Sequence, residues 1–586
     1  MKKINITLIA LCAALLVPLG CKKNFLTQTN TFQSTADASF QKSSDVVGLV
    51  NAIYDSYQSG DYLKKSIWYY ANFQSHDWFN DGGDIQWNNY SISPTFAALY
   101  VFWTDAYIAI SRANAAFGII QTAIKNGVVT QDLGNRLQGE AYFLRGMTYY
   151  YLAGAYGSVP LVLKPGDLTL HTRSSQTEIF TQVVADMKQA EALLTTVPNL
   201  PAAEIGRATK EAAYAYEGSA QMWLGNYTAA LTAFNNPDLN TNCGLLPNFV
   251  DVGEFDHQNS KESVFAIQFD IQGSQSWDGG WQNGGEVAWI DDFSWPDEVS
   301  GFGYDYANPG LRYSFQPGDL RQAVTVIGPN DPNISPGIIA KWGGIKGYQV
   351  IIDRFNSKAT YGASVFYGDD GKIINTCGSN SHPWYGQDGT RSGYYCAKKW
   401  RDPNLTGANG TSAIFGSQNQ MLMRFAEVLL SRAECKIRTG DNAGALADIK
   451  KVRDRAFGGS APAVMQDGFV EKQADGTYQI EYHTVTDPMQ MVLSEYRHEL
   501  TGDYSLFFDL RRAGKAPSGN TYAQDFIHNN YNTVSTLTPI PYPYGPTADG
   551  KAHGVWNTSL PANHDILPIP QQAIGLNPNL GQNPGY

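Results

Sequence analysis

One long helix, predicted in the N-terminal third of the chain, places the strongest constraint on the fold. The segment from Leu137 to Pro165 reads LQGEAYFLRGMTYYYLAGAYGSVPLVLKP. Apolar or small residues recur in it at the i, i+3, i+4 and i+7 spacing of one helix face, and further tyrosines widen that face. Gly157 supplies a left-handed exit, and Pro160 prevents the helix from resuming. We therefore expect an inner helix that other helices cover on more than one side.

A helical-hairpin pattern occurs twice and predicts the scaffold around this helix. In each copy a small residue is followed after seven positions by Gly, after five more by Ala and after four more by a bulky apolar residue: Gly218, Gly225, Ala230 and Phe234, then Ala433, Gly440, Ala445 and Ile449. The Ala-x3-Phe half is a tetratricopeptide cue. Two copies cannot bury a continuous core. Helices near 102–122, 137–156 and 175–195 must complete the stack.

Composition and pattern divide the chain into regions that we expect to form one compact body after an N-terminal leader. The insertion among these regions holds seven of the thirteen tryptophans, a load too large for a simple connection. The predicted fold is mainly α, with a tetratricopeptide-like helical-hairpin scaffold, a large irregular loop-rich insertion and an extended Pro-rich C-terminal strap. The expected regions are a signal peptide (1–20), a lipid-anchored leash (21–44), an N-terminal helical part (45–234), the aromatic insertion (235–420), and the C-terminal hairpin with its tail (421–586).

The N-terminus has the features of an export signal that ends in lipid attachment. Lys2 and Lys3 precede an apolar run, which ends in a small residue followed by Cys21. This ending is similar to a bacterial lipobox, in which the cysteine is acylated, although Pro18 stands where a branched apolar residue is usual. We expect acylated Cys21 to tether the protein to membrane lipid.

Charge and motifs exclude several classes of function. The net charge is −12 and no basic cluster occurs, which excludes nucleic acid as a partner. The sequence has no Gly-x-Ser-x-Gly elbow, His-Glu-x-x-His helix, Walker loop or dinucleotide fingerprint, so we predict neither a catalytic residue nor a cofactor. No metal site is predicted. The sequence leaves open whether the pairs Asp291-Asp292 and Asp369-Asp370 lie in solvated turns or bind calcium. Whether Cys377 and Cys396 form a disulfide is also open.

Two Gly-containing loops mix aromatic rings with amides and carboxylates. Such a mixture suits a sugar, because a pyranose stacks its apolar C–H face on a ring while its hydroxyls need donors and acceptors. The same rings could instead cap the core beneath the loops, and the sequence leaves both interpretations open. The candidate ligand-binding residues are Trp78, Asp81, Trp87, Asn88 and Tyr90 in the first loop, and Trp281 and Trp289 in the second.

Several phrases of the chain, in order, resemble the SusD/RagB-type outer-membrane nutrient-binding lipoproteins of Bacteroidetes. They include AYFLRGMTYYYLAGAYGSVPLV in the central helix, RFAEVLLSRAECKIRTGDNAGALADIKKVRDRA in the second repeat and QNPGY at the C-terminus. The family's next phrase after the second repeat is E-R-x2-E-L-x2-E-G-x-R-x2-D-L. This chain keeps part of it but places other residues at four positions, which leaves the local ion-pair network in question: Tyr496, Asp503, Tyr504 and Leu506. Arg497 is the candidate substitute for the first missing arginine.

The resemblance implies a function in nutrient capture. It implies a lipid-anchored protein of the outer membrane, facing the cell exterior, that binds oligosaccharide and passes it to a SusC-like TonB-dependent transporter without cutting it. One alternative is a helical-barrel glycosidase or polysaccharide lyase, which the tetratricopeptide register disfavours because those enzymes close their hairpins into a ring. Another is a SusD-like binder of peptides or glycoproteins.

Overall fold

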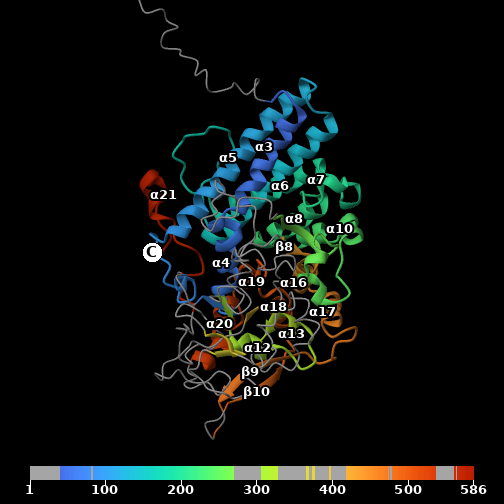
Figure 1. Cartoon of the computed structure of the whole chain (residues 1–586). Coiled ribbons are helices and arrows are strands. Elements are labelled where there is room, and N and C mark those ends of the chain that lie inside the picture. Colours follow the sequence, from blue (N-terminus) through green and yellow to red (C-terminus); the bar gives the residue numbers. More distant parts are fainter. Residues whose placement is uncertain are drawn as a thin grey trace, which may run out of the picture.

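Helices pack on helices as a stack in the computed structural model, and the strands of the described residues occur as antiparallel pairs (Figure 1). No helix in the described part of the chain is both long enough and apolar enough to span a bilayer. The structure describes residues 40–80, 84–269, 305–327, 418–472, 474, 478–535, 560–562 and 564–586, and the backbone of 365–367, 373–376 and 395–396.

Helix α6 (Gln131–Tyr156) lies inside this stack. The Thr130 side chain caps it by accepting a hydrogen bond from the Leu133 N–H, and Gly157, at a φ of 74°, ends it. Its residues from Phe143 onward are all buried, because α5 (Ala97–Lys125) and α7 (Gln176–Leu193) pack against it. The predicted inner helix is confirmed.

Glycines and one buried ion pair bring α7 close to α6. A Cβ atom at Gly146 would lie 2.7 Å from the Met187 methyl group and 3.1 Å from the Asp186 Cβ, so the two helices approach closely at this glycine. Arg145 donates two parallel hydrogen bonds to Asp186, at 2.9 and 2.6 Å. Such a bidentate pair fixes orientation as well as distance.

Both copies of the repeat form helical hairpins, as predicted. Helices α8 (Lys210–Trp223) and α9 (Tyr227–Phe234) form the first, and α16 (Phe425–Arg438) and α17 (Asn442–Ala456) form the second. The turn glycines Gly225 and Gly440 have φ values of 72° and 89°, which larger residues rarely adopt. Asp441 caps α17 by accepting from the Gly444 N–H. Helix α16 packs on α9, so the two copies are neighbours in space.

The long excursion between the hairpins leaves and returns through one pair of strands. Strand β2 (Ser263–Ile267) pairs antiparallel with β8 (Gln420–Arg424), with Ser263 opposite Arg424 and Ile267 opposite Gln420. Ordered elements continue past the expected start of the insertion, through α10 (Pro237–Asn242) to β2. The division of the chain into five regions stays a prediction.

Further helices and strands complete the described structure. They are α3 (Ser43–Asp55), η2 (Ser56–Gln58), η3 (Gly60–Ile67), α4 (Trp68–Phe73), β1 (Trp78–Asn80), η4 (Ile85–Trp87), η5 (Val197–Asn199), η6 (Ala202–Glu204), η7 (Phe249–Gly253), η8 (Phe255–His257), β3 (Asp305–Ala307), α12 (Pro309–Ser314), α13 (Arg321–Thr325), β4 (Val326–Ile327), β5 (Val365–Tyr367), β6 (Ile373–Thr376), β7 (Tyr395–Cys396), β9 (Gln466–Lys472), β10 (Tyr478–Thr484), α18 (Pro488–Leu500), α19 (Leu506–Arg512), α20 (Tyr522–Ser535), α21 (Gln571–Leu576) and η11 (Pro578–Leu580).

Buried ion pairs join this excursion to the second hairpin and to α18. Arg424 donates to Asp503 at 2.8 Å, to Glu262 at 2.9 Å and to Glu499 at 2.8 Å. Arg321 contributes a further pair with Glu495, at 2.8 Å. All of these side chains are almost completely buried, so their charges are compensated inside the protein and not by water.

Of the residues that depart from the family phrase, Asp503 takes part in these ion pairs. Asp503 accepts from Arg424, and Arg497 pairs with the buried Asp77, 2.9 Å from Nε to Oδ1. Tyr496 donates its hydroxyl hydrogen to Ser431, at 3.1 Å. The sequence left open whether an ion-pair network forms here, and the structure contains one. In it, Arg497 pairs with Asp77, on the segment after α4.

The C-terminal tail is ordered against the side of the stack, where α21 lies beside α5 (Figure 1). The Leu567 N–H donates to the Ala155 carbonyl at 2.8 Å, and Asn583 donates to the Tyr156 carbonyl at 3.0 Å. The prolines did not exclude all helix from the tail, since α21 occupies the Pro-free residues 571–576. The expected extended strap is thus interrupted by a short helix.

We expect Arg424→Met to lower the free energy of unfolding by about 3 to 5 kcal/mol, because removal of one member of a buried ion cluster leaves its partners uncompensated. Chemical unfolding followed by circular dichroism measures this. The control is Lys450→Met on α17, where an exposed pair with Asp454 contributes less than about 0.5 kcal/mol. Equal effects of the two substitutions would contradict the role of the network.

Two glycine substitutions test the helix packing. A Cβ atom at Gly218 would lie 2.4 Å from the Phe234 ring, whereas at Gly118 on α5 nothing lies within 4 Å. We expect Gly218→Ala to destabilise the protein by about 1 to 3 kcal/mol through overpacking. Gly118→Ala should stabilise it by about 0.5 to 1 kcal/mol through helix propensity. Thermal unfolding of the two variants, side by side, checks the opposite signs.

Candidate functional site

The structure places the tryptophans of the first predicted loop inside the protein. Trp78 lies on β1, which pairs antiparallel with β3, and it donates its indole N–H to Thr501 at 2.8 Å. Trp87 packs edge-on against Tyr69, with ring centroids 6.2 Å apart. Both indoles are 0% exposed. This burial argues against a direct contact between either ring and a ligand.

The polar residues of the same loop hold it together. Asn88 accepts from the Asn80 N–H at 3.1 Å and donates back to the Asn80 carbonyl at 2.6 Å, which closes the loop at its base. Tyr90 is buried and donates to the Gln74 carbonyl at 3.0 Å. Ligand contact by these residues stays a prediction, and in the described structure they stabilise the loop.

The other sequence predictions for the site fall outside the described residues. Asp81, Trp281 and Trp289 belong to this group and stay predictions as ligand contacts. The acidic pairs at 291–292 and 369–370 and the partner cysteine Cys377 also lie outside it.

A buried carboxyl group lies beside this loop on β3. Asp305 is 0% exposed and accepts from the Asn80 side-chain amide at 2.6 Å, while its Oδ2 has no hydrogen-bond partner among the described residues. Burial raises the pKa of Asp305 to about 8, because the charged form loses its hydration. The protonated, neutral form of Asp305 therefore predominates at pH 7 in the folded protein.

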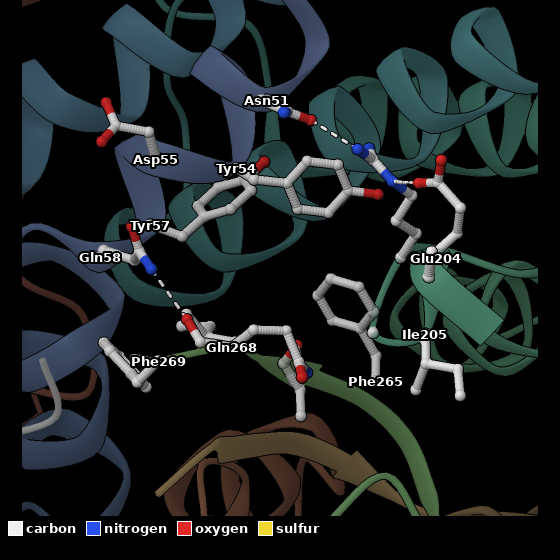
Figure 2. Close-up of a pocket in the computed structure, with 15 residues that line it drawn as sticks. Asn51, Tyr54, Asp55, Tyr57, Gln58, Glu204, Ile205, Phe265, Gln268 and Phe269 are labelled. Carbon is white, nitrogen blue, oxygen red and sulfur yellow. Dashed lines mark hydrogen bonds and ion pairs between the residues drawn. The ribbon is translucent and has the colours of Figure 1, made fainter. Parts of the chain in front are cut away.

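A solvent-accessible pocket of about 610 Å³ lies between the end of α3, the loop at 203–207 and the end of β2 (Figure 2). Three segments far apart in sequence thus form its walls. The lining residues are Asn51, Tyr54, Asp55, Tyr57, Gln58, Ala203, Glu204, Ile205, Gly206, Arg207, Phe265, Ala266, Ile267, Gln268 and Phe269.

Aromatic rings line two sides of this pocket. Figure 2 shows Tyr54 and Tyr57 across from Phe265 and Phe269. The Tyr54 hydroxyl accepts from the Ala208 N–H at 2.9 Å, and the Tyr57 hydroxyl donates to the Leu144 carbonyl at 2.7 Å. Because both hydroxyls are bonded to the scaffold, the tyrosine rings are held in place. Ile205 lies at the edge, 57% exposed.

Amide groups fix the third side. Gln58 donates to the Gln268 main-chain carbonyl at 2.8 Å, which ties η2, directly after α3, to the residue that follows β2. The Gln268 side chain accepts from Asn259 at 2.8 Å and from Asn419 at 2.7 Å. Gly206, at a φ of 97°, approaches Gln268 so closely that a Cβ atom would lie 2.5 Å from it. The loop therefore sits directly on the strand.

The sequence analysis did not identify this pocket. Its aromatic residues satisfy ordinary core patterns, since Tyr54 follows the apolar stripe of α3 and Phe265 lies in a short apolar strand. The one signal was the glycine of the Gly206-Arg207 phrase before α8, because a glycine in a polar loop often marks a close backbone approach.

Replacement of Asp305 by Asn should change how stability depends on pH. The folded state keeps this carboxyl protonated up to about pH 8, whereas the unfolded chain ionises near the ordinary value of 3.8. As the pH rises from 5 to 8, the wild type therefore loses stability by up to about 1.4 kcal/mol per pH unit from this group. Asp305→Asn removes the loss and keeps the bond from Asn80. Chemical unfolding at pH 5 and at pH 8 measures the free energy of unfolding of both proteins. If the difference in this free energy between wild type and variant is the same at both pH values, the raised pKa of Asp305 is contradicted.

Two family models match the chain. The model described as "SusD family" matches residues 261–586, and the one described as "Starch-binding associating with outer membrane" matches residues 6–219. "SusD-like protein P2" of Formosa agariphila is 22% identical over the whole of both chains. "SusD-like protein P25" of the same organism is 23% identical over 85% of this chain and 83% of its own.

Solved structures share the fold. A "Laminarin binding SusD-like protein" has a TM-score of 0.64 at 18% identity, covering 93% of this chain and 100% of its own. "Surface glycan-binding protein A" from Bacteroides thetaiotaomicron, in complex with laminarihexaose, has a TM-score of 0.63 at 18% identity, covering 92% and 99%. This likeness confirms a mainly helical SusD-like fold with packed helical hairpins.

The family assignment follows from these matches. The family's members are glycan-binding proteins associated with the outer membrane and are not catalytic, in agreement with the prediction that this chain is no enzyme. Since the first model alone covers more than half of the chain, the protein belongs to the SusD/RagB family.

Proposed function

We propose that the protein captures oligosaccharide at the outer face of the outer membrane and passes it to a SusC-like TonB-dependent transporter. The observation that carries this proposal is the pocket between α3, the loop at 203–207 and β2, whose rings and amides match the surfaces of a sugar. Acylated Cys21 and the leash up to residue 44 would keep the pocket close to the membrane.

The size and chemistry of the pocket support a sugar ligand. Its volume of about 610 Å³ lies within the range of roughly 300 to 1,000 Å³ that is usual for small-molecule sites. Of its rings, the half-buried Tyr54 offers a stacking surface for C–H faces, whereas Tyr57, Phe265 and Phe269 are buried and shape the wall. The Asn51 amide nitrogen offers a donor and the Gln58 amide oxygen an acceptor for hydroxyls. The backbone around it is held by hydrogen bonds, so little ordering cost accompanies binding.

Relatives point to glycans as the ligand class. Solved structures with this fold are described as binding laminarin, as a complex with laminarihexaose and as a complex with xylogluco-oligosaccharide. These descriptions concern those proteins, and by family likeness they favour a glycan over a peptide for this chain. Trp281 and Trp289 in the insertion, and Asp81 in the first loop, remain proposed additional contacts.

A soluble form that lacks residues 1–21 tests the proposal. Isothermal titration with a panel of oligosaccharides should show binding to at least one of them, and chromatography of the recovered sugar should show it uncut. Shortened sugar would contradict a binding-only function, and absence of binding across a broad panel would contradict glycan capture.

Pocket variants locate the binding. Ile205→Trp places a bulky ring at the exposed edge, and Gln58→Leu removes an amide from the wall. We expect each to weaken glycan binding by about tenfold or more, the effect of losing about 1.4 kcal/mol of interaction. Gln131→Leu is the matched control, because Gln131 is an exposed glutamine at the start of α6. Unchanged affinity in both pocket variants would place the binding elsewhere.

A further inference from the structure

We infer that the pocket selects uncharged glycans and excludes glycans that carry carboxylate or sulfate groups, because the arginines around it are already paired with carboxylates of the protein. This inference rests on the proposed function, since it names the ligand class of the same pocket. It depends on Arg207, Arg136 and Arg112 and on the three carboxylates that they contact.

Arg207 is the arginine in the pocket wall, and the protein already engages each of its nitrogens. Nη1 donates to Glu140 at 2.8 Å, Nη2 donates to Asn51 at 2.7 Å, and Nε pairs with Glu204. The dashed lines that reach Asn51 and Glu204 in Figure 2 mark two of these bonds. The guanidinium also lies over the Tyr54 ring, 5.7 Å from its centroid. A ligand anion would have to displace a carboxylate to bind it.

The two other arginines near the pocket are paired as well. Arg136 lies 3.2 Å from Glu204 and 3.5 Å from Glu140. Arg112 lies 3.1 Å from Asp55, a carboxylate of the pocket lining. Three arginines thus face three carboxylates, and this group carries no net charge.

A lysine near the pocket carries only part of a positive charge at neutral pH. Lys64 lies 5.4 Å from the centroid of the Phe269 ring and is 2% exposed. Burial lowers the pKa of Lys64 to about 7, so its ammonium form is only partly populated at neutral pH.

The cost of an acidic ligand follows from this pairing. A carboxylate or sulfate that enters the pocket loses hydration and meets Glu204 and Asp55, with every nearby guanidinium already bound. Asn51 and Gln58, by contrast, are neutral. The Asn51 amide oxygen already accepts from Arg207, and its amide nitrogen can donate to a hydroxyl. The Gln58 amide nitrogen already donates to the Gln268 carbonyl, and its amide oxygen can accept from a hydroxyl. The net charge of −12 repels polyanions at longer range as well, an effect that salt screens.

Matched probes test the selectivity in the soluble form that lacks residues 1–21. Laminari-, xyloglucan- and malto-oligosaccharides are titrated beside derivatives of the same backbones that carry C6 carboxylates or sulfates, at low and at high NaCl. We expect the acidic member of each bound pair to be at least tenfold weaker. The difference should persist at high salt, because pairing within the pocket is screened much less than long-range repulsion.

A charge variant tests the cause. Glu204→Gln keeps the side-chain shape but removes the carboxylate shared by Arg207 and Arg136. We expect it to narrow the ratio of neutral to acidic affinity by about tenfold. Glu471→Gln, on the β9–β10 hairpin, is the control and should leave the ratio unchanged. Thermal unfolding of each variant checks that the fold is intact.

The outcomes separate the two proposals. If no probe of either kind binds, the proposed function fails. If an acidic derivative binds as tightly as its neutral parent, glycan capture stands and the selectivity inference is wrong. If the wild type prefers neutral probes but Glu204→Gln leaves the ratio unchanged, saturation of the arginines is not the cause and the inference is overturned.

Discussion

The ion pairs of the buried Arg424 guanidinium are the interactions on which the packing of the long excursion against the helices depends. Burial lowers the pKa of Arg424, but the carboxylates of Asp503, Glu499 and Glu262 more than offset this effect, and the pKa is raised on balance. A charge removed from water is tolerated only with partners at short distance. These ion pairs therefore fix strand β8, on which the excursion returns, beside strand β2, on which it leaves.

This closure also builds the pocket. Strand β2 carries Phe265 and leads to Phe269, so pairing with β8 fixes one wall. The opposite wall is fixed by α6, since Tyr57 donates to the Leu144 carbonyl of that helix and Arg207 pairs with its Glu140. One inner helix and one ion cluster thus hold the two sides of a rigid site. A preorganised pocket of this kind suits capture and release without chemistry.

Long periodic segments could be predicted from sequence, whereas the exposure of the aromatic residues could not. Helix α6 and the two hairpins follow from spacing and from turn glycines, which are local properties. The burial of Trp78 depends on Thr501, 423 positions later in the chain, which accepts its indole N–H. Rings among amides are equally compatible with a sugar platform and with a satisfied core. In the structure, Trp78 and Trp87 are buried in the core.

The sequence by itself determined the helical-hairpin scaffold and the family, and it predicts the signals for export and acylation, because each depends on short segments whose physics is local. Only the tertiary structure decided which rings line a pocket and which charges compensate one another. Tyr54, Arg207 and Phe265 come from three distant segments and meet only when the helices pack. Arg424 finds Asp503 in the same way. Such contacts depend on burial and long-range closure, which no local pattern encodes.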